Sequence, residues 1–372
     1  MKHRLGMTNR QNNLVRDVLF VLFLAAFAWS AALVASTPSG GDRLYRAVVS
    51  VEDRSEDTRS DAIETAGKQV LTRVTGYRDP DAREEMEAVM DRLEGLVDSF
   101  RYTTDDDDEL KLEVQFDSDA LDRAIRDAEA PLWGRERPRT LVWLAIRDGG
   151  ERELLTEEEA RERAPELLEV AEARGLPLLF PIMDIEDRSA VSFADVWGGF
   201  DEEVLEASAR YASNAILIAR AERAAGDRWS ARWNLYEPDG DIRWRSDSGD
   251  RGQVLAEGLH EAADRFAAQF AVIGDVDADE RIELRIRELE RLEDYVEVER
   301  YLRDMTPVEN VRLESLERDT AVFSLAVRGG RHSLDQAIRL GSRLVPVDTA
   351  DEPQDAAGLV PVETLPTYRY RS

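Results

Sequence analysis

The sequence predicts an α/β (α+β) protein, with three small α/β units in series behind an N-terminal hydrophobic export helix. Two observations predict this organisation. Residues 18–34 are uncharged, in a chain in which 34% of the residues are charged. Beyond this run, strand-like alternation and helix-like spacing of apolar residues follow one another repeatedly. The predicted segments are 1–36 for export, 43–130, 131–275 and 280–350 for the three units, and 351–372 for a mobile tail.

The export segment has the features of a signal peptide or of an N-terminal membrane anchor. As a helix, residues 18–34 would span about 26 Å, near the thickness of a hydrocarbon core. A buried core helix would show a polar stripe, which this run lacks. The basic flank ahead of it stays cytoplasmic, and small residues at 34–36 allow cleavage. We therefore expect the remaining chain in the periplasm, either released after cleavage or anchored to the inner membrane by residues 18–34.

The first unit, residues 43–130, begins with a strand and a long helix. In "LYRAVVSV" the apolar residues alternate, as in a strand buried on one face. Residues 56–75 have apolar side chains at helical spacing, and Gly76 supplies a left-handed stop. The other predicted elements are a helix over 81–96, a strand over 110–116 and a short helix over 118–128.

The second unit, residues 131–275, is predicted to be an α/β sandwich with a tryptophan-rich hairpin. Residues 141–146 are a nearly continuous apolar run, which is typical of a strand buried on both faces. "RWSARWNLY" and "DIRWR" place Trp229, Trp233 and Trp244 on one face of a hairpin. The other predicted elements are strands in "LPLLFPIMD" and "NAILIAR" and helices over 165–174, 201–211 and 255–273.

The third unit, residues 280–350, follows the order β-α-β-β-α-β. "RIELRI" alternates as a strand, and apolar spacing predicts a helix over 292–302 and a later strand hairpin. This order is that of a ferredoxin-like split βαβ unit. From residue 351 the chain has three prolines and no clear period, so we expect a mobile tail.

The composition excludes several classes of function. The formal net charge of −29 leaves no basic footprint for nucleic acid or for an anionic membrane surface. The chain has no cysteine, and its three histidines lack the spacing of metal ligands. Phosphate loops, nucleophile elbows and zinc-protease motifs are absent from the sequence. We therefore predict no catalytic residues, no metal, no cofactor and no enzymatic activity.

Two stretches are candidate binding loops. "PLWGRERP" and "FADVWGGFD" each place a tryptophan against glycine at the boundary of a predicted element. An indole with arginines nearby can bind an anionic or sugar-like ligand. Alternatively, each tryptophan plugs the end of a sheet while the glycine makes the turn. The candidate binding residues are Trp133, Arg135, Arg137, Asp195 and Trp197.

Several stretches resemble a family of exported envelope proteins of Gram-negative bacteria, domain of unknown function family 2066. The similarity covers most of the chain after the export segment, and its most specific motif is the Trp-Gly-Arg-Glu-Arg-Pro run. The resemblance implies an exported envelope protein and implies no established activity. The stretches are "LYRAVVSVEDRSEDTRSDAIETAGKQVLTRVTG", "ALDRAIRDAEAPLWGRERPRTLVWLAI", "LPLLFPIMDIED", "ADVWGGFDEEVLEASARY" and "WSARWNLYEPDG".

Three functions fit the sequence. The first is a non-catalytic interaction or scaffold module in the periplasm, with an envelope protein as its partner and with the inner membrane contacted only through the N-terminal segment. The second is a binding module for a small envelope ligand that uses the Trp133 and Trp197 loops. The third is a periplasmic hydrolase with paired carboxylates, since 78 acidic residues make such pairs common.

Overall fold

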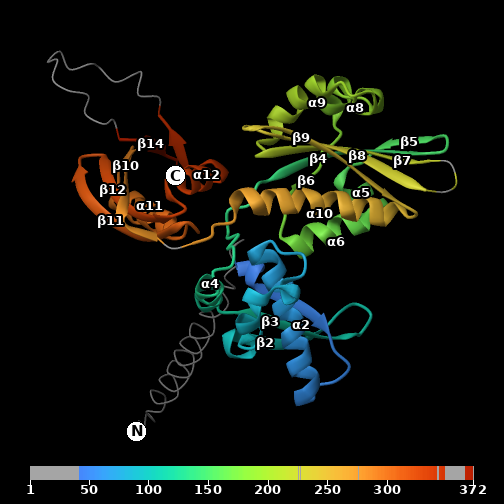
Figure 1. Ribbon diagram of the computed structural model, residues 1–372. Helices are drawn as coiled ribbons and strands as arrows, with labels where there is room; N and C mark the ends of the chain where they lie inside the picture. Colours follow the sequence, from blue (N-terminus) through green and yellow to red (C-terminus); the bar gives the residue numbers. More distant parts are fainter. Residues whose placement is uncertain are drawn as a thin grey trace, which may run out of the picture. The chain divides into compact units, whose positions relative to one another are not determined.

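The protein is described by a computed structural model that covers residues 42–224, 226, 228–274, 276–341, 343–347 and 365–371. The described part contains three β-sheets with helices packed on them (Figure 1), so the predicted mixed α/β class is confirmed. The export segment lies outside the described residues. In the described part of the chain, no helix is both long and apolar enough to cross a membrane.

The first sheet is antiparallel and has three strands in the order β1-β3-β2. Helix α2 packs on it, begins at the Ser55 cap and ends at Gly76, whose φ of 78° is left-handed. The strands are β1 (Arg46–Ser50), β2 (Val97–Thr104) and β3 (Leu110–Phe116), and the main helices are α2 (Glu56–Thr75) and α4 (Ser118–Asp127). A short 3₁₀ turn, η1 (Asp42–Tyr45), precedes β1.

One expectation for this unit is wrong, and one strand was not expected. The predicted helix over 81–96 is a series of short turns, although Met86, Val89 and Leu93 are buried as the spacing indicated. Strand β2 was not predicted, because this edge strand is mostly exposed and its sequence barely alternates. The short elements are η2 (Pro80–Ala82), η3 (Glu84–Met86), α3 (Glu87–Met90) and η4 (Leu93–Leu96).

The second sheet has the order β5-β4-β7-β8-β9, and β6 pairs with β4. Its centre is parallel between β4 and β7, and β7, β8 and β9 form an antiparallel meander. The strands are β4 (Thr140–Asp148), β5 (Glu151–Leu154), β6 (Leu178–Leu179), β7 (Ala215–Arg223), β8 (Trp229–Glu237) and β9 (Gly240–Ser248).

Helices cover both faces of this sheet. Alternate side chains of β4 enter two separate cores: Val142 and Leu144 on one face, and Leu141 and Trp143 on the other. The expected strand buried on both faces is therefore confirmed. On the Val142 face lie α5 (Glu157–Arg163), α6 (Pro165–Arg174) and α10 (Arg251–Phe270); on the Leu141 face lie α7 (Ile185–Ala190), α8 (Phe193–Gly198) and α9 (Asp201–Ser208), followed by η5 (Ala209–Tyr211).

The third sheet has the order β11-β12-β10-β14-β13. Without β14 this is the strand order of the predicted ferredoxin-like unit. The prediction of a mobile tail is wrong for residues 367–370. These residues form β14, which pairs in parallel with β10 and buries Tyr368 and Tyr370. The elements are β10 (Val276–Arg287), α11 (Leu292–Arg303), β11 (Val308–Glu317), β12 (Thr320–Arg328), α12 (Gly330–Leu340), β13 (Leu344–Pro346) and β14 (Thr367–Tyr370).

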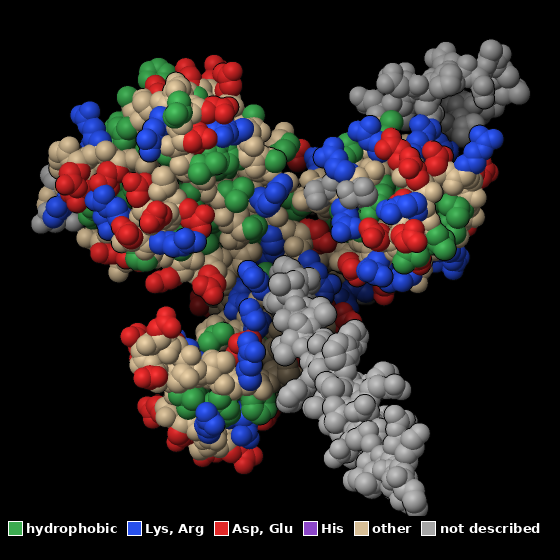
Figure 2. Space-filling model, turned by 180° about the vertical axis from the view of Figure 1, so that it is seen from behind, with side chains coloured by type: hydrophobic (Ala, Val, Ile, Leu, Met, Phe, Trp, Pro, Cys, Tyr) green, Lys and Arg blue, Asp and Glu red, His purple; other side chains and the backbone are tan. Residues whose placement is uncertain are grey.

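The surface carries both signs of charge. On the face seen in Figure 2, acidic and basic side chains are intermixed, with hydrophobic side chains between them. Singly scattered apolar side chains are normal on a protein surface, and only a contiguous cluster of them indicates a binding surface.

Candidate functional site

The Trp133 side chain is buried where the end of helix α2 meets the second sheet. Its indole is 1% exposed, and its backbone N–H donates to the carbonyl of Val74 at 2.6 Å. Gly76 lies against the ring, since a Cβ at that position would be 3.4 Å from the indole. The expectation of an open binding loop is not met at Trp133, and the alternative of a plug fits this geometry.

Arg137 lies on the Trp133 ring and binds backbone carbonyls. Its guanidinium carbon is 3.8 Å from the ring centroid. Its Nε donates to the Gly134 carbonyl at 2.7 Å, and Nη2 donates to the carbonyls of Arg73 (2.8 Å) and Trp133. Burial lowers the pKa of Arg137 to about 9, so the side chain stays charged at neutral pH. Arg137 thus joins its own loop to the last turn of α2.

A second buried arginine binds the same helix end. Arg174, at the end of α6, is 0% exposed and donates to the carbonyl of Gly76 at 2.8 Å. It also forms an ion pair with Asp264 of α10 at 2.7 Å. The last carbonyls of a helix have no intrahelical partner and carry partial negative charge. Two guanidinium groups from the second unit therefore cap α2 of the first unit.

The same loop also contacts the third unit. The Arg135 N–H donates to Thr306 Oγ1 at 3.1 Å, and the Thr306 N–H donates to the Glu136 carboxylate at 3.3 Å. A Cβ at Gly134 would lie 1.7 Å from Thr306 Oγ1, so only glycine fits this close approach. Thr306 lies between α11 and β11. We call residues 133–137 the hub loop, because they contact all three units.

The Arg135 side chain lies beside the buried Tyr45 and its half-buried partner Asp122. Its Nη2 donates to Ser118 Oγ at 3.1 Å, and its guanidinium carbon is 5.7 Å from the Tyr45 ring centroid. The Tyr45 hydroxyl donates to Asp122 at 2.7 Å. Burial raises the pKa of Asp122 to about 6, against the lowering effects of the Tyr45 hydrogen bond and of Arg126 and Arg135. Burial also raises the pKa of Tyr45, so its hydroxyl stays protonated and remains the donor to Asp122.

The Trp197 side chain lies in α8, against the core on the opposite face of the second sheet. Its ring stacks on Phe193, with centroids 5.5 Å apart and planes 10° apart. The guanidinium carbons of Arg147 and Arg232 lie 4.3 Å and 5.7 Å from the ring centroid. The predicted pairing of an indole with arginines therefore occurs here, with arginines that sequence reasoning did not name.

Asp195 has a local role at the start of α8. Its carboxylate accepts from the N–H and the hydroxyl of Ser192, which forms a capping box. These hydrogen bonds lower the pKa of Asp195. The structure thus separates the five predicted residues into two sets on opposite faces of the second sheet, and they form no common pocket.

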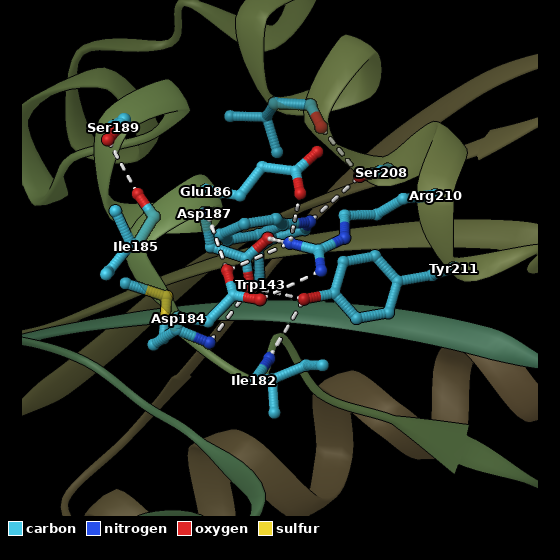
Figure 3. A network of polar contacts seen from close by, with 12 residues as sticks. Trp143, Ile182, Asp184, Ile185, Glu186, Asp187, Ser189, Ser208, Arg210 and Tyr211 are labelled. Atoms are coloured by element: carbon cyan, nitrogen blue, oxygen red, sulfur yellow. Dashed lines mark hydrogen bonds and ion pairs between the residues drawn. The ribbon is translucent and has the colours of Figure 1, made fainter.

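A polar network between α7 and η5 was also missed (Figure 3). Asp187 is 1% exposed and accepts from Arg210 Nη1 at 3.0 Å and from the Tyr211 hydroxyl. Asp184 caps α7 and pairs with Arg210 at 2.8 Å, which holds the pKa of Asp184 well below its usual range. In the sequence these two aspartates, Arg210 and Tyr211 look like ordinary surface residues. The two aspartates lie about 25 positions away from their partners, so no local pattern reveals the network.

The polar groups of these clusters hold segments of the fold together through hydrogen bonds. The hub arginines donate to carbonyls, and the carboxylates of the α7 network accept from side chains and backbone. Among residues 42–371, as far as they are described, no group of three or more His, Cys, Asp or Glu could hold a metal ion.

Comparison with known proteins gives one match. A family model described as a domain of unknown function (DUF8605) matches residues 41–134. No curated protein matches, and no solved structure matches. The match spans the first sheet with its helices and ends inside the hub loop. It agrees with the expected uncharacterised domain, though not with family 2066 specifically, and the chain thus carries over residues 41–134 a domain of unknown function.

Proposed function

We propose that this chain is an exported, non-catalytic interaction or scaffold module of a Gram-negative envelope, and that it acts in the periplasm. The resemblance to family 2066 supports export, as does the apolar run at 18–34. The proposal includes release after cleavage or anchoring in the inner membrane by that run. It names an envelope protein as the partner.

The single observation that carries the proposal is the hub loop. One five-residue segment binds the end of α2 through Arg137 and binds Thr306 of the third unit through backbone and side-chain groups. Three small units tied together at one buried loop present several surfaces in a fixed arrangement. Such an arrangement suits a protein that brings partners together.

A crosslinking experiment in intact cells tests this function. Formaldehyde is added to cells that produce the tagged full chain, and the crosslinked species are purified under denaturing conditions and identified by mass spectrometry. We expect a discrete species that contains the chain and a defined second polypeptide. A chain recovered only as the uncrosslinked polypeptide would contradict the proposal.

The location is tested separately. A reporter that is active only in the periplasm is fused to the C-terminus of the full chain, and a second fusion carries a reporter active only in the cytoplasm. We expect activity from the first fusion alone. Activity from the cytoplasmic reporter would show that the chain is not exported and would contradict this part of the proposal.

The Trp197 loop favours a second candidate, the binding of a small anionic ligand. Arg232 faces this ring, and no carboxylate of the described residues lies within ion-pair distance of it. Its cross-strand neighbours Arg220 and Arg245 are paired with Asp201 and Asp247. Titration calorimetry with succinate should give a binding heat that is lost in Arg232→Gln. The exposed Arg92→Gln variant is the matched control, and absence of heat at millimolar succinate would reject the candidate.

A further inference from the structure

A small cavity lies between the turn of the β8–β9 hairpin, the end of α10 and helix α12. Its volume is about 160 Å³. Sites for drug-sized ligands hold roughly 300–1,000 Å³, and a single water needs roughly 10–15 Å³. The cavity therefore suits a compound of a few non-hydrogen atoms. Its apolar walls are formed by Pro138, Pro238, Phe270 and Leu340.

A buried amide without a partner lines this cavity. The Gln336 side chain of α12 is 6% exposed, and its amide forms no hydrogen bond with any residue that the structure describes. The other buried side chains of α12 are apolar and belong to the core of the third unit. Buried polar groups are almost always hydrogen-bonded, so an unpaired amide that faces a cavity indicates a ligand there.

The cavity also contains a carboxylate without a cation. Glu237, at the end of β8, is half-buried and accepts from the Gln269 amide at 3.1 Å, with the Gln269 oxygen and nitrogen assigned from their partners. Burial raises the pKa of Glu237, and the negative charge of Asp239 raises it further. The carboxylate is thus partly removed from water and lacks the positive partner that usually accompanies such a group.

The charges around the cavity leave the Glu237 carboxylate unbalanced. Among the described residues that line the cavity, the one basic residue is Arg339, and it pairs with Asp239 at 3.3 Å. That ion pair is neutral, so the net charge of the lining is negative. The Ser213 hydroxyl, which has no hydrogen-bond partner in the described part of the chain, is a further acceptor in the same lining.

We propose that this cavity binds a primary ammonium group on a short alkyl stem. An ammonium has three N–H donors and no acceptor, and the lining supplies the Glu237 carboxylate, the Gln336 amide oxygen and the Ser213 hydroxyl. The apolar walls cover the stem. An anion would be repelled by Glu237, and a hydrocarbon would leave both Glu237 and Gln336 unpaired. The site adds to the proposed scaffold function and does not depend on it.

Ligand-observed NMR on the purified full chain tests the site, with n-butylamine as the probe and 1-butanol as its uncharged match. Saturation of the protein should transfer to the butyl protons, and a titration should give a dissociation constant of about 1 mM or below. The alcohol should bind at least about tenfold more weakly, because it lacks the charge. Equal binding of the two compounds, or no transfer at about 10 mM butylamine, would overturn the proposal.

Two substitutions locate the bound ammonium. Glu237→Gln keeps the shape of the side chain and should weaken butylamine binding at least about tenfold. Gln336→Leu should weaken it about threefold, because one of three acceptors is lost. The matched control is Glu94→Gln, which changes an exposed carboxylate of η4 and should leave the affinity unchanged.

Urea unfolding shows that each variant is folded. Gln336→Leu should unfold at a higher urea concentration than the unaltered chain, because it removes an unpaired buried amide. If Glu237→Gln is folded and binds butylamine as tightly as the unaltered chain, the ammonium does not lie in this cavity and the proposal is wrong.

A blocked lysine distinguishes two sources of the same chemistry. N-acetyl-lysine methylamide presents an ammonium on a flexible alkyl stem that is attached to a peptide backbone. Competition with butylamine at similar affinity would identify the ligand as a lysine side chain of a polypeptide. Competition at least about tenfold weaker would identify it as a free amine, because the peptide groups do not fit. Either result supports the site.

Discussion

The hub loop and the Trp197 loop share a sequence signature and differ in structure. Each places a tryptophan next to glycine, with an acidic residue nearby. Trp133 is 1% exposed and is enclosed by Gly76, Arg137 and backbone carbonyls. The Trp197 indole is only partly buried, and guanidinium groups from two strands lie on it.

The difference shows that segments far away in the sequence determine how deeply each tryptophan ring is buried. The end of α2 packs on the hub loop and is itself bound by Arg174, and Thr306 of the third unit contacts the loop. At Trp197 the groups on the ring are Phe193 of the same helix and Arg147 and Arg232 of the sheet, and the ring stays partly exposed. The hub loop is therefore a structural joint, whereas the Trp197 ring stays partly exposed in the folded protein.

The largest expected difference is in the two tryptophan truncations. Trp133→Ala should lower the free energy of unfolding by about 3–5 kcal/mol, because it removes a fully buried aromatic side chain. Trp197→Ala should lower it by about 1 kcal/mol, because the ring is partly solvated in the folded state. Urea unfolding of both variants measures this. Equal losses would show that the two loops do not differ as described.

Removal of the guanidinium groups gives the next largest contrast. Arg137→Met should cost about 2–4 kcal/mol, because the carbonyls of Arg73, Trp133 and Gly134 lose a buried donor. Arg147→Met should cost under about 1 kcal/mol, because its ion pair with Glu222 is partly exposed. The same urea series measures both. A loss under 1 kcal/mol for Arg137→Met would contradict the capping of α2.

A methyl group at Gly134 tests the joint to the third unit. Gly134→Ala should cost about 1–3 kcal/mol through its clash with Thr306. In the background of Thr306→Gly this cost should largely disappear, which a double-mutant cycle measures as coupling. Gly95→Ala is the control, since nothing lies within 4 Å of a Cβ at that position. Costs that simply add would place Thr306 away from the hub loop.

The smallest expected effect is on pH dependence. The folded-state pKa of Asp122 is about 6, above the unfolded value of about 3.9, so the protonated carboxyl favours the folded state. Its contribution is fully present below about pH 4 and is lost as the pH rises through about 6. Asp122→Asn should remove about 1–2 kcal/mol of the difference between pH 4.5 and pH 7.5. An unchanged pH profile would place the carboxyl in water.

The elements that could be predicted from the sequence have strong local patterns. Helix α2 has apolar spacing and a Gly76 stop, β4 is a continuous apolar run, and the β8–β9 hairpin alternates around a turn. Strand β14 was missed because its pairing with β10 joins residues about 80 positions apart. A tail of this composition has no local pattern that reveals such a partner.

The candidate site could be predicted only in part. The unusual composition of residues 131–138 singled out the correct segment, yet its role depends on Arg174 and Thr306, which carry no signal of their own. Arg174 in the last turn of α6 looks like an ordinary solvated helix end. Arg174 is buried because it contacts the first unit at Gly76. The spacing of residues along the sequence contains no information on that contact.

Hydrogen exchange in the native state tests the central claim most directly. The amides of Trp133, Arg135 and Thr306 donate to Val74, Thr306 and Glu136 across the three units. We predict that these three amides exchange as slowly as those of β4 and at least a hundredfold more slowly than those of Gly149 and Gly150 in the exposed β4–β5 turn. Exchange of all three at the rate of that turn would show that the loop does not join the units.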